Sequence, residues 1–414
     1  MFTNVTKYFR KTPLFPLFDT LNHIDSIPSE NITLSRIDPI DFEKALAFLK
    51  SYRGSQGTFN AYRREIERLL QWCGLVQKSL NQLKREDIEE FIRFCQKPPK
   101  SWVGTKKVSR FMIKEGERIS NPEWRPFIVD VSKSDFKKGD RPNLKDFEFS
   151  QEAVKDSFAI LSSFYNYLLQ DEYVYMNPVA LIRQKSKFIR KQQGPIKIRR
   201  LSDVQWQCVI NTAKEMAETE PPKYERTFFI MSALYSMYLR VSELAASERW
   251  QPMMKHFHQD SDQNWWFTTV GKGNKQRQIA VSDAMLLALK RWREYLGLSP
   301  LPSPADKSPL LPKIKGSGPI TDTTHIRTIV QKCFDNAIEE LKKNNLPEEA
   351  ESLAEVTVHW LRHTGISDDI KHRPREHVRD DAGHSSSAIT DKYVDIELKA
   401  RHRSAQKKAI FDKT

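Results

Sequence analysis

Apolar residues that recur at intervals of three and four dominate the longer segments of this chain. The pattern is clearest from Thr323 to about Lys343. The apolar side chains of that segment are Ile326, Ile329, Val330, Cys333, Ala337 and Leu341. An α-helix has about 3.6 residues per turn, so this spacing gathers apolar side chains on one face that must be buried. The pattern therefore predicts a chain that is mainly helical.

The first half of the chain repeats this spacing. Helices are predicted at three segments there: Gly57 to Gly74, Asp87 to Cys95, and Gln151 to Gln170. Residues 1–40 contain several prolines and no period, so we interpret them as an N-terminal arm. Residues 41–182 are predicted to form a helical domain, in which residues 97–148 lack a period and are interpreted as an insertion.

The second half begins with a helix-start signal and contains one strand signal. Ser202 and Gln205 have the spacing of a capping box, which marks the first turn of a helix. The β-prone runs Trp265 to Val270 and Gln276 to Val281 flank the turn Gly271-Lys272-Gly273-Asn274, which predicts an antiparallel hairpin. The predicted fold class is mainly α with a small antiparallel β-sheet.

The charge of the chain favours a polyanionic partner. The 67 Lys and Arg residues exceed the 53 Asp and Glu residues, giving a net charge of +14, and nucleic acid is the first candidate for such a surface. Residues 183–201 carry no acidic side chain and are interpreted as an interdomain linker that lies along phosphates. A merely solvated linker is the alternative. The basic residues of this linker are Arg183, Lys185, Lys187, Arg190, Lys191, Lys197, Arg199 and Arg200.

Other features narrow the class of protein. No run of about 18 apolar residues exists, which argues against a membrane protein. The four cysteines lie far apart and form no C-x-x-C pair, so we expect thiols in a reducing compartment and not disulfides or a zinc site. The N-terminus lacks the pattern of a signal peptide. We therefore expect a cytoplasmic protein that associates with the nucleoid through DNA.

Five short motifs in the second half carry the residues that could do chemistry. In chain order they are Leu239-Arg240-Val241-Ser242-Glu243-Leu244, Val270-Gly271-Lys272-Gly273-Asn274-Lys275-Gln276-Arg277, His359-Trp360-Leu361-Arg362-His363-Thr364, Ala382-Gly383-His384-Ser385-Ser386, and Thr390-Asp391-Lys392-Tyr393. Taken singly, each is more often structural than functional. Their order and spacing together resemble the catalytic domain of the tyrosine recombinases, the phage-integrase family, over residues 202–400. The preceding helical block looks like the core-binding domain of that family.

The resemblance implies a site-specific DNA recombinase, an integrase or transposase of a mobile element. It implies a core DNA-binding domain at residues 41–182, a catalytic domain at residues 202–395 and a tail at residues 396–414 that docks on a neighbouring protomer. The implied partners are double-stranded DNA, further copies of the chain in a synaptic tetramer, and accessory recombination proteins. No cofactor or metal is required.

The resemblance also assigns the site residues. Its catalytic positions are Arg240, Lys272, His359, Arg362, His384 and Tyr393. Tyr393 would be the nucleophile, because a tyrosine can store the energy of a phosphodiester as a phosphotyrosine. Two guanidiniums suit the non-bridging phosphate oxygens, since each can donate two parallel hydrogen bonds. Lys272 would protonate the leaving 5′-hydroxyl, and the acidic Glu243 would support the arginines from behind.

The histidines have related roles in this scheme. His359 would accept the proton of the tyrosine or hold a phosphate oxygen, and His384 would donate to the phosphate. The chain departs from the family pattern at Tyr238, where glycine is common, and at Ala382, where leucine is usual. The helix junction at Tyr238 must therefore pack differently, and the small Ala382 should leave room to be filled.

Three other interpretations compete with this one. Asp368, Asp369, Asp380 and Asp381 could belong to a two-metal nuclease, although adjacent Asp residues are commoner on solvated faces. A non-catalytic DNA-binding protein on a recombinase fold is the second, but such a chain would be expected to have lost some catalytic residues. A type IB-like topoisomerase is the third, and it would share the chemistry while acting as a monomer.

Overall fold

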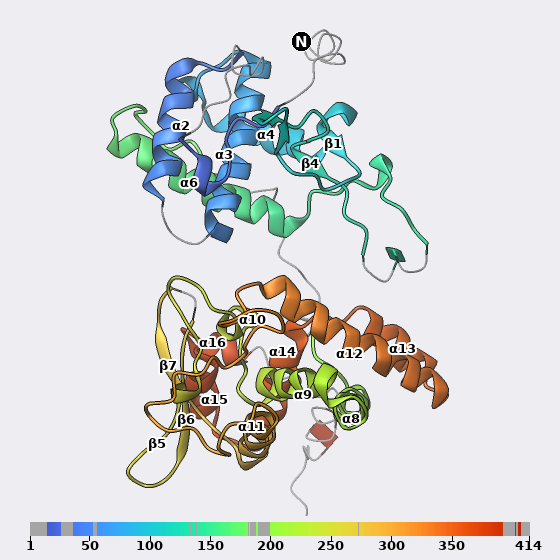
Figure 1. Cartoon of the computed structure of the whole chain (residues 1–414). Helices are drawn as coiled ribbons and strands as arrows, with labels where there is room; N and C mark the ends of the chain where they lie inside the picture. The colour runs from blue at the N-terminus through green and yellow to red at the C-terminus, as the bar shows by residue number, and fades with distance from the viewer. Residues whose placement is uncertain are drawn as a thin grey trace, which may run out of the picture. The chain divides into compact units, whose positions relative to one another are not determined.

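The computed structural model describes residues 15–25, 36–52, 56–132, 135–136, 139–180, 182, 188, 199–271, 273–391, 402 and 405–406. The chain divides into two compact units, residues 1–193 and 194–414 (Figure 1). Each unit has its own buried apolar core. Within the described ranges, no helix combines the length and apolar character that crossing a bilayer requires.

The first unit is built from helices that match the apolar periodicity. They are α2 (Pro39–Ser51), α3 (Gln56–Val76), α4 (Arg85–Gln96) and α6 (Gln151–Gln170), with the 3-10 turns η1 (Leu21–His23) and η3 (Leu80–Gln82). The predictions of the last three helices are confirmed to within two residues. Their apolar faces meet in one core that includes Phe59, Ile66, Phe91 and Phe158, all fully buried.

The described part of the predicted N-terminal arm packs on this core. Leu17 and Phe18 are each 2% exposed. Arg118 donates to the Asp19 carboxylate through Nε and Nη2, and Arg63 donates to the Asp19 backbone oxygen. An aperiodic segment can therefore still belong to a core, because single apolar residues are buried without forming a repeating face.

The segment predicted as an insertion, residues 97–148, is also integrated into the first core. It contains η4 (Lys100–Trp102), β1 (Val103–Gly104), β2 (Phe111–Lys114), β3 (Glu117–Ser120), β4 (Phe127–Ile128) and η5 (Leu144–Asp146). β1 pairs parallel with β4, and β2 pairs antiparallel with β3. Trp102 and Phe127 are buried, and the guanidinium of Arg68 lies 4.4 Å from the Phe127 ring centroid. Strands of two to four residues are too short to show a period of two, so the sequence did not predict them.

The second unit consists mainly of helices. They are α8 (Asp203–Thr219), α9 (Pro221–Ser236), α10 (Val241–Leu244), α11 (Asp283–Tyr295), α12 (Thr323–Lys343), α13 (Pro347–Ala354), α14 (His359–Asp369), α15 (Arg375–Ala382) and α16 (Ser387–Thr390), with the 3-10 turn η6 (Met254–His256). The capping box at the start of α8 is confirmed, because Ser202 and Gln205 bond each other's backbone N–H groups.

The hairpin prediction is confirmed as two strands of a three-stranded antiparallel sheet. β6 (Trp265–Val270) pairs with β7 (Gln276–Ala280), and β5 (Phe257–Gln259) adds an outer strand. α15 lies against β7, where the Ala280 N–H donates to Asp381 Oδ1 at 3.3 Å. This contact sets the chain around Gly383 and His384 beside the sheet. The predicted fold class, mainly helical with a small antiparallel sheet, is confirmed.

Candidate active site

Glu243, which is 1% exposed, lies at the centre of a charged cluster in the second unit. Arg240 caps the start of α10, and its backbone N–H and Nη1 donate to the Glu243 carboxylate at 2.8 and 3.1 Å. Arg277 on β7 donates to the same carboxylate through Nη1 at 2.7 Å and Nη2 at 2.9 Å. One buried carboxylate thus holds two guanidiniums that come from segments more than 30 residues apart.

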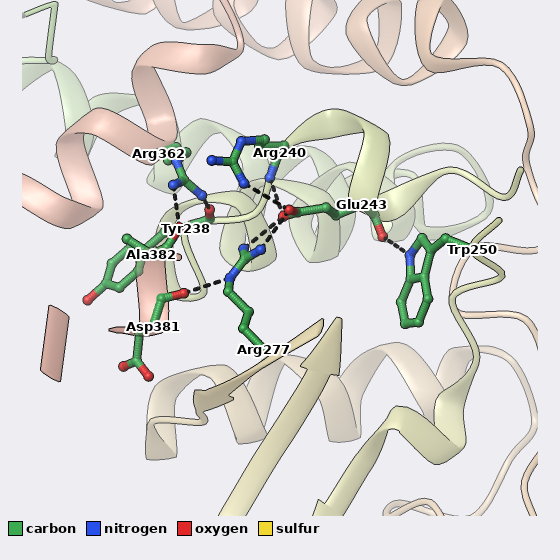
Figure 2. Close-up of polar contacts among 8 residues, drawn as sticks. All are labelled: Tyr238, Arg240, Glu243, Trp250, Arg277, Arg362, Asp381 and Ala382. Carbon is green, nitrogen blue, oxygen red and sulfur yellow. Dashed lines mark hydrogen bonds and ion pairs between the residues drawn. The ribbon is translucent and has the colours of Figure 1, made fainter. Parts of the chain in front are cut away.

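The electrostatics of this cluster keep Glu243 ionised. Burial by itself would raise the pKa of the Glu243 carboxyl, but the hydrogen bonds and charge of Arg277, with those of Arg240, hold that pKa below its ordinary value. The indole N–H of Trp250 donates to the Glu243 backbone oxygen at 2.9 Å, which holds the short helix α10 in place (Figure 2). Glu243 therefore holds both guanidiniums in place, while its predicted part in the reaction stays a prediction.

The hairpin closes on the same cluster through a glycine. A Cβ on Gly271 would lie 3.0 Å from both Arg277 Nη1 and Glu243 Oε1. A larger residue at this position would press on the ion pair, so glycine permits the close approach. Gly271, which precedes Lys272 in the sequence, therefore lies beside the Glu243 cluster.

Arg362 joins two further segments from the first turn of α14. The side chain is buried, and it donates from Nη1 to the Tyr238 backbone oxygen and from Nη2 to the Ala382 backbone oxygen at 2.6 Å. Tyr238 follows α9, and Ala382 ends α15. Figure 2 shows Arg362 and Arg240 beside each other, with Arg277 bridging Glu243 and the Asp381 carbonyl.

The histidines lie in the field of these arginines. Burial and the charges of Arg362 and Arg240 lower the pKa of His359, and the same causes with Arg277 lower the pKa of His384 to about 4. The His384 Nδ1 is 2.9 Å from Thr390 Oγ1. His359 meets the ring of His363 edge-on, with centroids 4.6 Å apart. In the protein alone both predicted histidines are therefore neutral at pH 7, and neutral imidazoles can accept or donate a proton.

The structure thus brings together four of the predicted catalytic positions: Arg240, His359, Arg362 and His384. Lys272 and Tyr393 lie outside the described residues. So do Arg183, Lys185, Lys187, Arg190, Lys191 and Lys197 of the predicted linker. Arg199 and Arg200 are described, and the charge of Arg199 contributes to lowering the pKa of His363 to about 4. The DNA contacts predicted for the linker remain a prediction.

Sequence reasoning gave no role to Arg277, which completes the cluster. It is 9% exposed in its side chain and links β7, α10 and α15 through Glu243 and the Asp381 carbonyl. The signal available in the sequence was Glu243 itself, because a buried carboxylate needs cationic partners and Arg240 is only one. Which of the many other arginines supplies the second contact is decided by the fold.

The two departures from the family pattern lie in one small apolar cluster. Tyr238 and Ala382 pack there with Ile366 and Val378, all at most 1% exposed. The large ring at one position accompanies the small methyl group at the other, and Figure 2 shows the two residues next to each other. The two departing positions therefore belong to one apolar cluster.

The aspartates considered for metal catalysis each pair with a basic side chain. Asp368 bonds Lys371, Asp369 and Asp381 bond Arg373, and Asp380 bonds Arg379. Asp368 and Asp369 also accept hydrogen bonds from the phenols of Tyr235 and Tyr238. Asp369 and Asp381 thus join α14 to α15 through Arg373, whereas Asp380 pairs only with its neighbour on α15.

Comparison with known families identifies the fold that holds this cluster. The profile described as the phage integrase family matches residues 199–399, and that of the phage integrase N-terminal SAM-like domain matches residues 43–110. The chain belongs to the phage integrase family. The resemblance inferred from the five motifs of this chain is confirmed.

Solved structures with a similar fold are tyrosine recombinases. The integrase fold matches that of the XerH site-specific recombinase bound to a palindromic difH substrate in a post-cleavage complex, at 14% identity over 90% of each chain, with a TM-score of 0.53. A lambda integrase dimer bound to a COC′ core site matches at 14% identity over 89% of this chain and 80% of that one, with a TM-score of 0.47. The Tn1549 transposon integrase with circular intermediate DNA matches at 13% identity over 89% and 98%, with a TM-score of 0.49. No curated protein sequence matches the chain.

Replacing Arg277 with lysine is expected to destabilise the second unit of this protein by about 3 kcal/mol. A lysine cannot span both Glu243 oxygens, and it leaves a buried carboxylate only partly compensated. The measurement is urea unfolding, followed by hydrogen exchange in peptides from residues 194–414.

Arg291→Lys is the matched control for this change. Arg291 also bonds both oxygens of a glutamate, Glu225, but its side chain is 30% exposed. The loss there is expected to stay below about 1 kcal/mol. Glu225 is buried as Glu243 is, so the two pairs differ mainly in the exposure of the arginine. Equal losses for the two variants would show that the deeper burial of Arg277 does not matter.

Proposed function

We propose that this protein cuts and rejoins duplex DNA at specific sites through a covalent 3′-phosphotyrosine at Tyr393. The observation that carries the proposal is the placement of Arg240 and Arg362, each held by hydrogen bonds that it donates to buried acceptors. Fixed guanidiniums stabilise the charge that develops on a phosphorane because they need no reorganisation during the reaction. Membership of the phage integrase family supports the same chemistry.

The reaction requires one bond to form and one to break at phosphorus. The Tyr393 oxygen attacks, the bond to the 5′-oxygen breaks, and the 3′-phosphate remains on the tyrosine. His359 would take the phenolic proton, and Lys272 would supply a proton to the leaving 5′-oxygen. Arg240, Arg362 and His384 would hold the non-bridging oxygens. Attack by a 5′-hydroxyl from another strand then reverses these steps and frees the tyrosine.

Recombination between two sites requires four strand cuts, and each chain carries one Tyr393. We therefore propose a synaptic tetramer on DNA, with two protomers on each site and tails 396–414 docked between neighbours. Residues 41–182 and 202–395 would grip the duplex, and linker 183–201 would lie along its phosphates. The biological role proposed is that of an integrase or transposase of a mobile element, which works with accessory recombination proteins where its sites require them.

A nicked suicide DNA site tests the chemistry. Cleavage of such a site releases a short 5′-hydroxyl fragment, so the reverse reaction is lost and the covalent adduct accumulates. We expect an adduct in the presence of chelator, and a DNA-linked peptide that contains Tyr393. Adduct formation that needs a divalent metal, or a link through another residue, would contradict the proposal. So would wild-type protein that binds its site but never forms adduct.

DNA binding is expected to weaken about 100-fold or more between 50 and 200 mM salt, because neutralised phosphates release counterions.

Changing both Arg199 and Arg200 to glutamine should reduce the slope of log affinity against log salt by about 2, one for each lost phosphate contact. Fluorescence anisotropy with a labelled duplex measures the slope. Changing both Lys342 and Lys343 to glutamine serves as the control, because these lysines pair with Glu339 and Glu340. A slope equal to that of the wild type in the Arg199/Arg200 variant would remove these residues from the interface.

A further inference from the structure

Tyr238 occupies a backbone conformation that tyrosines seldom adopt. It lies between α9 and α10 with a φ of 49°, in the left-handed region, and it is 1% exposed. The conformation costs a non-glycine residue about 1–2 kcal/mol. Glycine would adopt it without strain, but glycine would have neither the ring nor the hydroxyl. The contacts of this side chain must therefore stabilise the conformation.

Both polar groups of Tyr238 are engaged next to the candidate active site. Its backbone oxygen accepts a hydrogen bond from Arg362 Nη1. Its hydroxyl donates to Asp369 Oδ2 and accepts from Arg373 Nη1 at 3.0 Å. Burial, with the hydrogen bond to Asp369 and its negative charge, raises the pKa of the phenol, so the hydroxyl remains protonated and can donate.

Arg373 continues these contacts towards the second carbonyl that holds Arg362. Its Nη2 donates to Asp381 Oδ2 at 2.6 Å, while its Nη1 also contacts Asp369 at 3.1 Å. Asp381 is followed by Ala382, whose backbone oxygen accepts from Arg362 Nη2. The hydrogen bonds form a closed ring that runs from the Tyr238 hydroxyl through Arg373 and Asp381–Ala382 to Arg362 and back to the Tyr238 carbonyl.

We propose that Tyr238 is a positioning residue for Arg362. The ring of hydrogen bonds fixes the separation of the Tyr238 and Ala382 carbonyls, and this separation sets the orientation of the guanidinium between them. Tyr238 acts through Arg362 and does not contact DNA, because its side chain is buried. A displacement of about 1 Å in a group that stabilises a transition state can cost about 100-fold in rate. The inference rests on the proposed strand-cleavage function.

Tyr238→Phe tests the role of the hydroxyl alone. The aromatic ring stays in the apolar cluster, but the contacts to Asp369 and Arg373 are lost. We expect the single-turnover rate of adduct formation on a suicide site to fall at least about tenfold, while the Kd for the same DNA stays within about twofold. An unchanged rate would overturn the proposal.

Tyr235→Phe is the matched control. Tyr235 lies on the last turn of α9, one helical turn before Tyr238, and its hydroxyl donates to the neighbouring aspartate, Asp368, at 2.9 Å. Asp368 pairs with Lys371, and within the described residues neither side chain bonds the ring of hydrogen bonds around Arg362. The control therefore loses a similar tyrosine–aspartate bond, and its cleavage rate should stay near that of the wild type. A rate loss equal to that of Tyr238→Phe would indicate a general packing effect and overturn the positioning role.

A double-mutant cycle shows whether the effect passes through Arg362. A lysine at position 362 cannot bond both carbonyls, so adding Tyr238→Phe to Arg362→Lys should cause no further loss of rate. Losses that multiply would contradict the proposal. If Tyr238→Phe fails to fold, Asp369→Asn keeps the tyrosine in place and is expected to slow cleavage in the same way; a normal rate would be equally decisive.

The outcome for the wild-type protein separates this inference from the proposed function. If wild-type protein forms no adduct, the proposed function fails and the positioning role fails with it. If wild-type protein forms the adduct and folded Tyr238→Phe forms it equally fast, only the positioning role is wrong.

Discussion

Protein with Tyr393 changed to phenylalanine is expected to form no covalent adduct with a suicide DNA site. Phenylalanine lacks the oxygen that attacks phosphorus in the proposed reaction, so the loss should exceed about 10⁴-fold and reach the detection limit. Binding of the duplex should be nearly unchanged, because the phenolic oxygen is one of many groups that approach the DNA. Gel analysis under denaturing conditions measures the adduct, and anisotropy measures binding.

Tyr295→Phe is the control for this experiment. Tyr295 ends α11, is 41% exposed and donates to the Pro222 backbone oxygen at 3.4 Å. Tyr295 belongs to the same unit, but no contact between it and the Glu243 cluster is recorded among the described residues. Its phenylalanine variant should form adduct at the wild-type rate. Adduct in the Tyr393 variant at a comparable rate would assign the nucleophile to another residue.

Replacing Arg362 with alanine is expected to slow strand cleavage by about 10²- to 10³-fold. Removal of one donor that stabilises transition-state charge commonly costs about 3–4 kcal/mol, which corresponds to this factor. The change also leaves the Tyr238 and Ala382 carbonyls without the Arg362 donor, at about 1–3 kcal/mol for each buried group. We therefore expect a lower unfolding free energy as well as a lower rate, measured separately by urea unfolding and single-turnover cleavage.

Arg226→Ala separates the two effects. Arg226 on α9 also donates from Nη1 to a backbone oxygen, that of Pro312, and lies over the ring of Trp292. This variant should lose stability without a comparable loss of cleavage rate at a temperature where it is folded. If both arginine variants lost activity in proportion to stability, Arg362 would have no special part in the chemistry.

The helices could be predicted from sequence where the apolar spacing is regular. The long helices α6 and α12 begin and end at the residues that the pattern indicated, because each buries one face against a core. The eight-residue helix α13 was not predicted, since it presents only Ala350 and Leu353 to the core and gives no repeating pattern. The short strands of residues 97–148 escaped prediction for the same reason.

The candidate site likewise contains residues that the sequence indicated and contacts that it did not. The motif order was enough to propose which arginines, histidines and tyrosine carry the chemistry, because spacing within a motif is a local property. The role of Arg277 depends on a contact with Glu243 across 34 residues of chain. The ring from Tyr238 to Arg373 and Asp381 depends on the packing of α9, α14 and α15.

By itself, the sequence determined that the chain is mainly helical, that its charge suits a polyanion, and which family its motifs resemble. These properties follow from composition and from residues close together in the chain. Only the tertiary structure decided that Glu243 holds two arginines and that Tyr238 and Ala382 together fix Arg362. The physical reason is that a buried ion pair or carbonyl contact is specified by distances between elements, and many sequences with the same local patterns would set those distances differently.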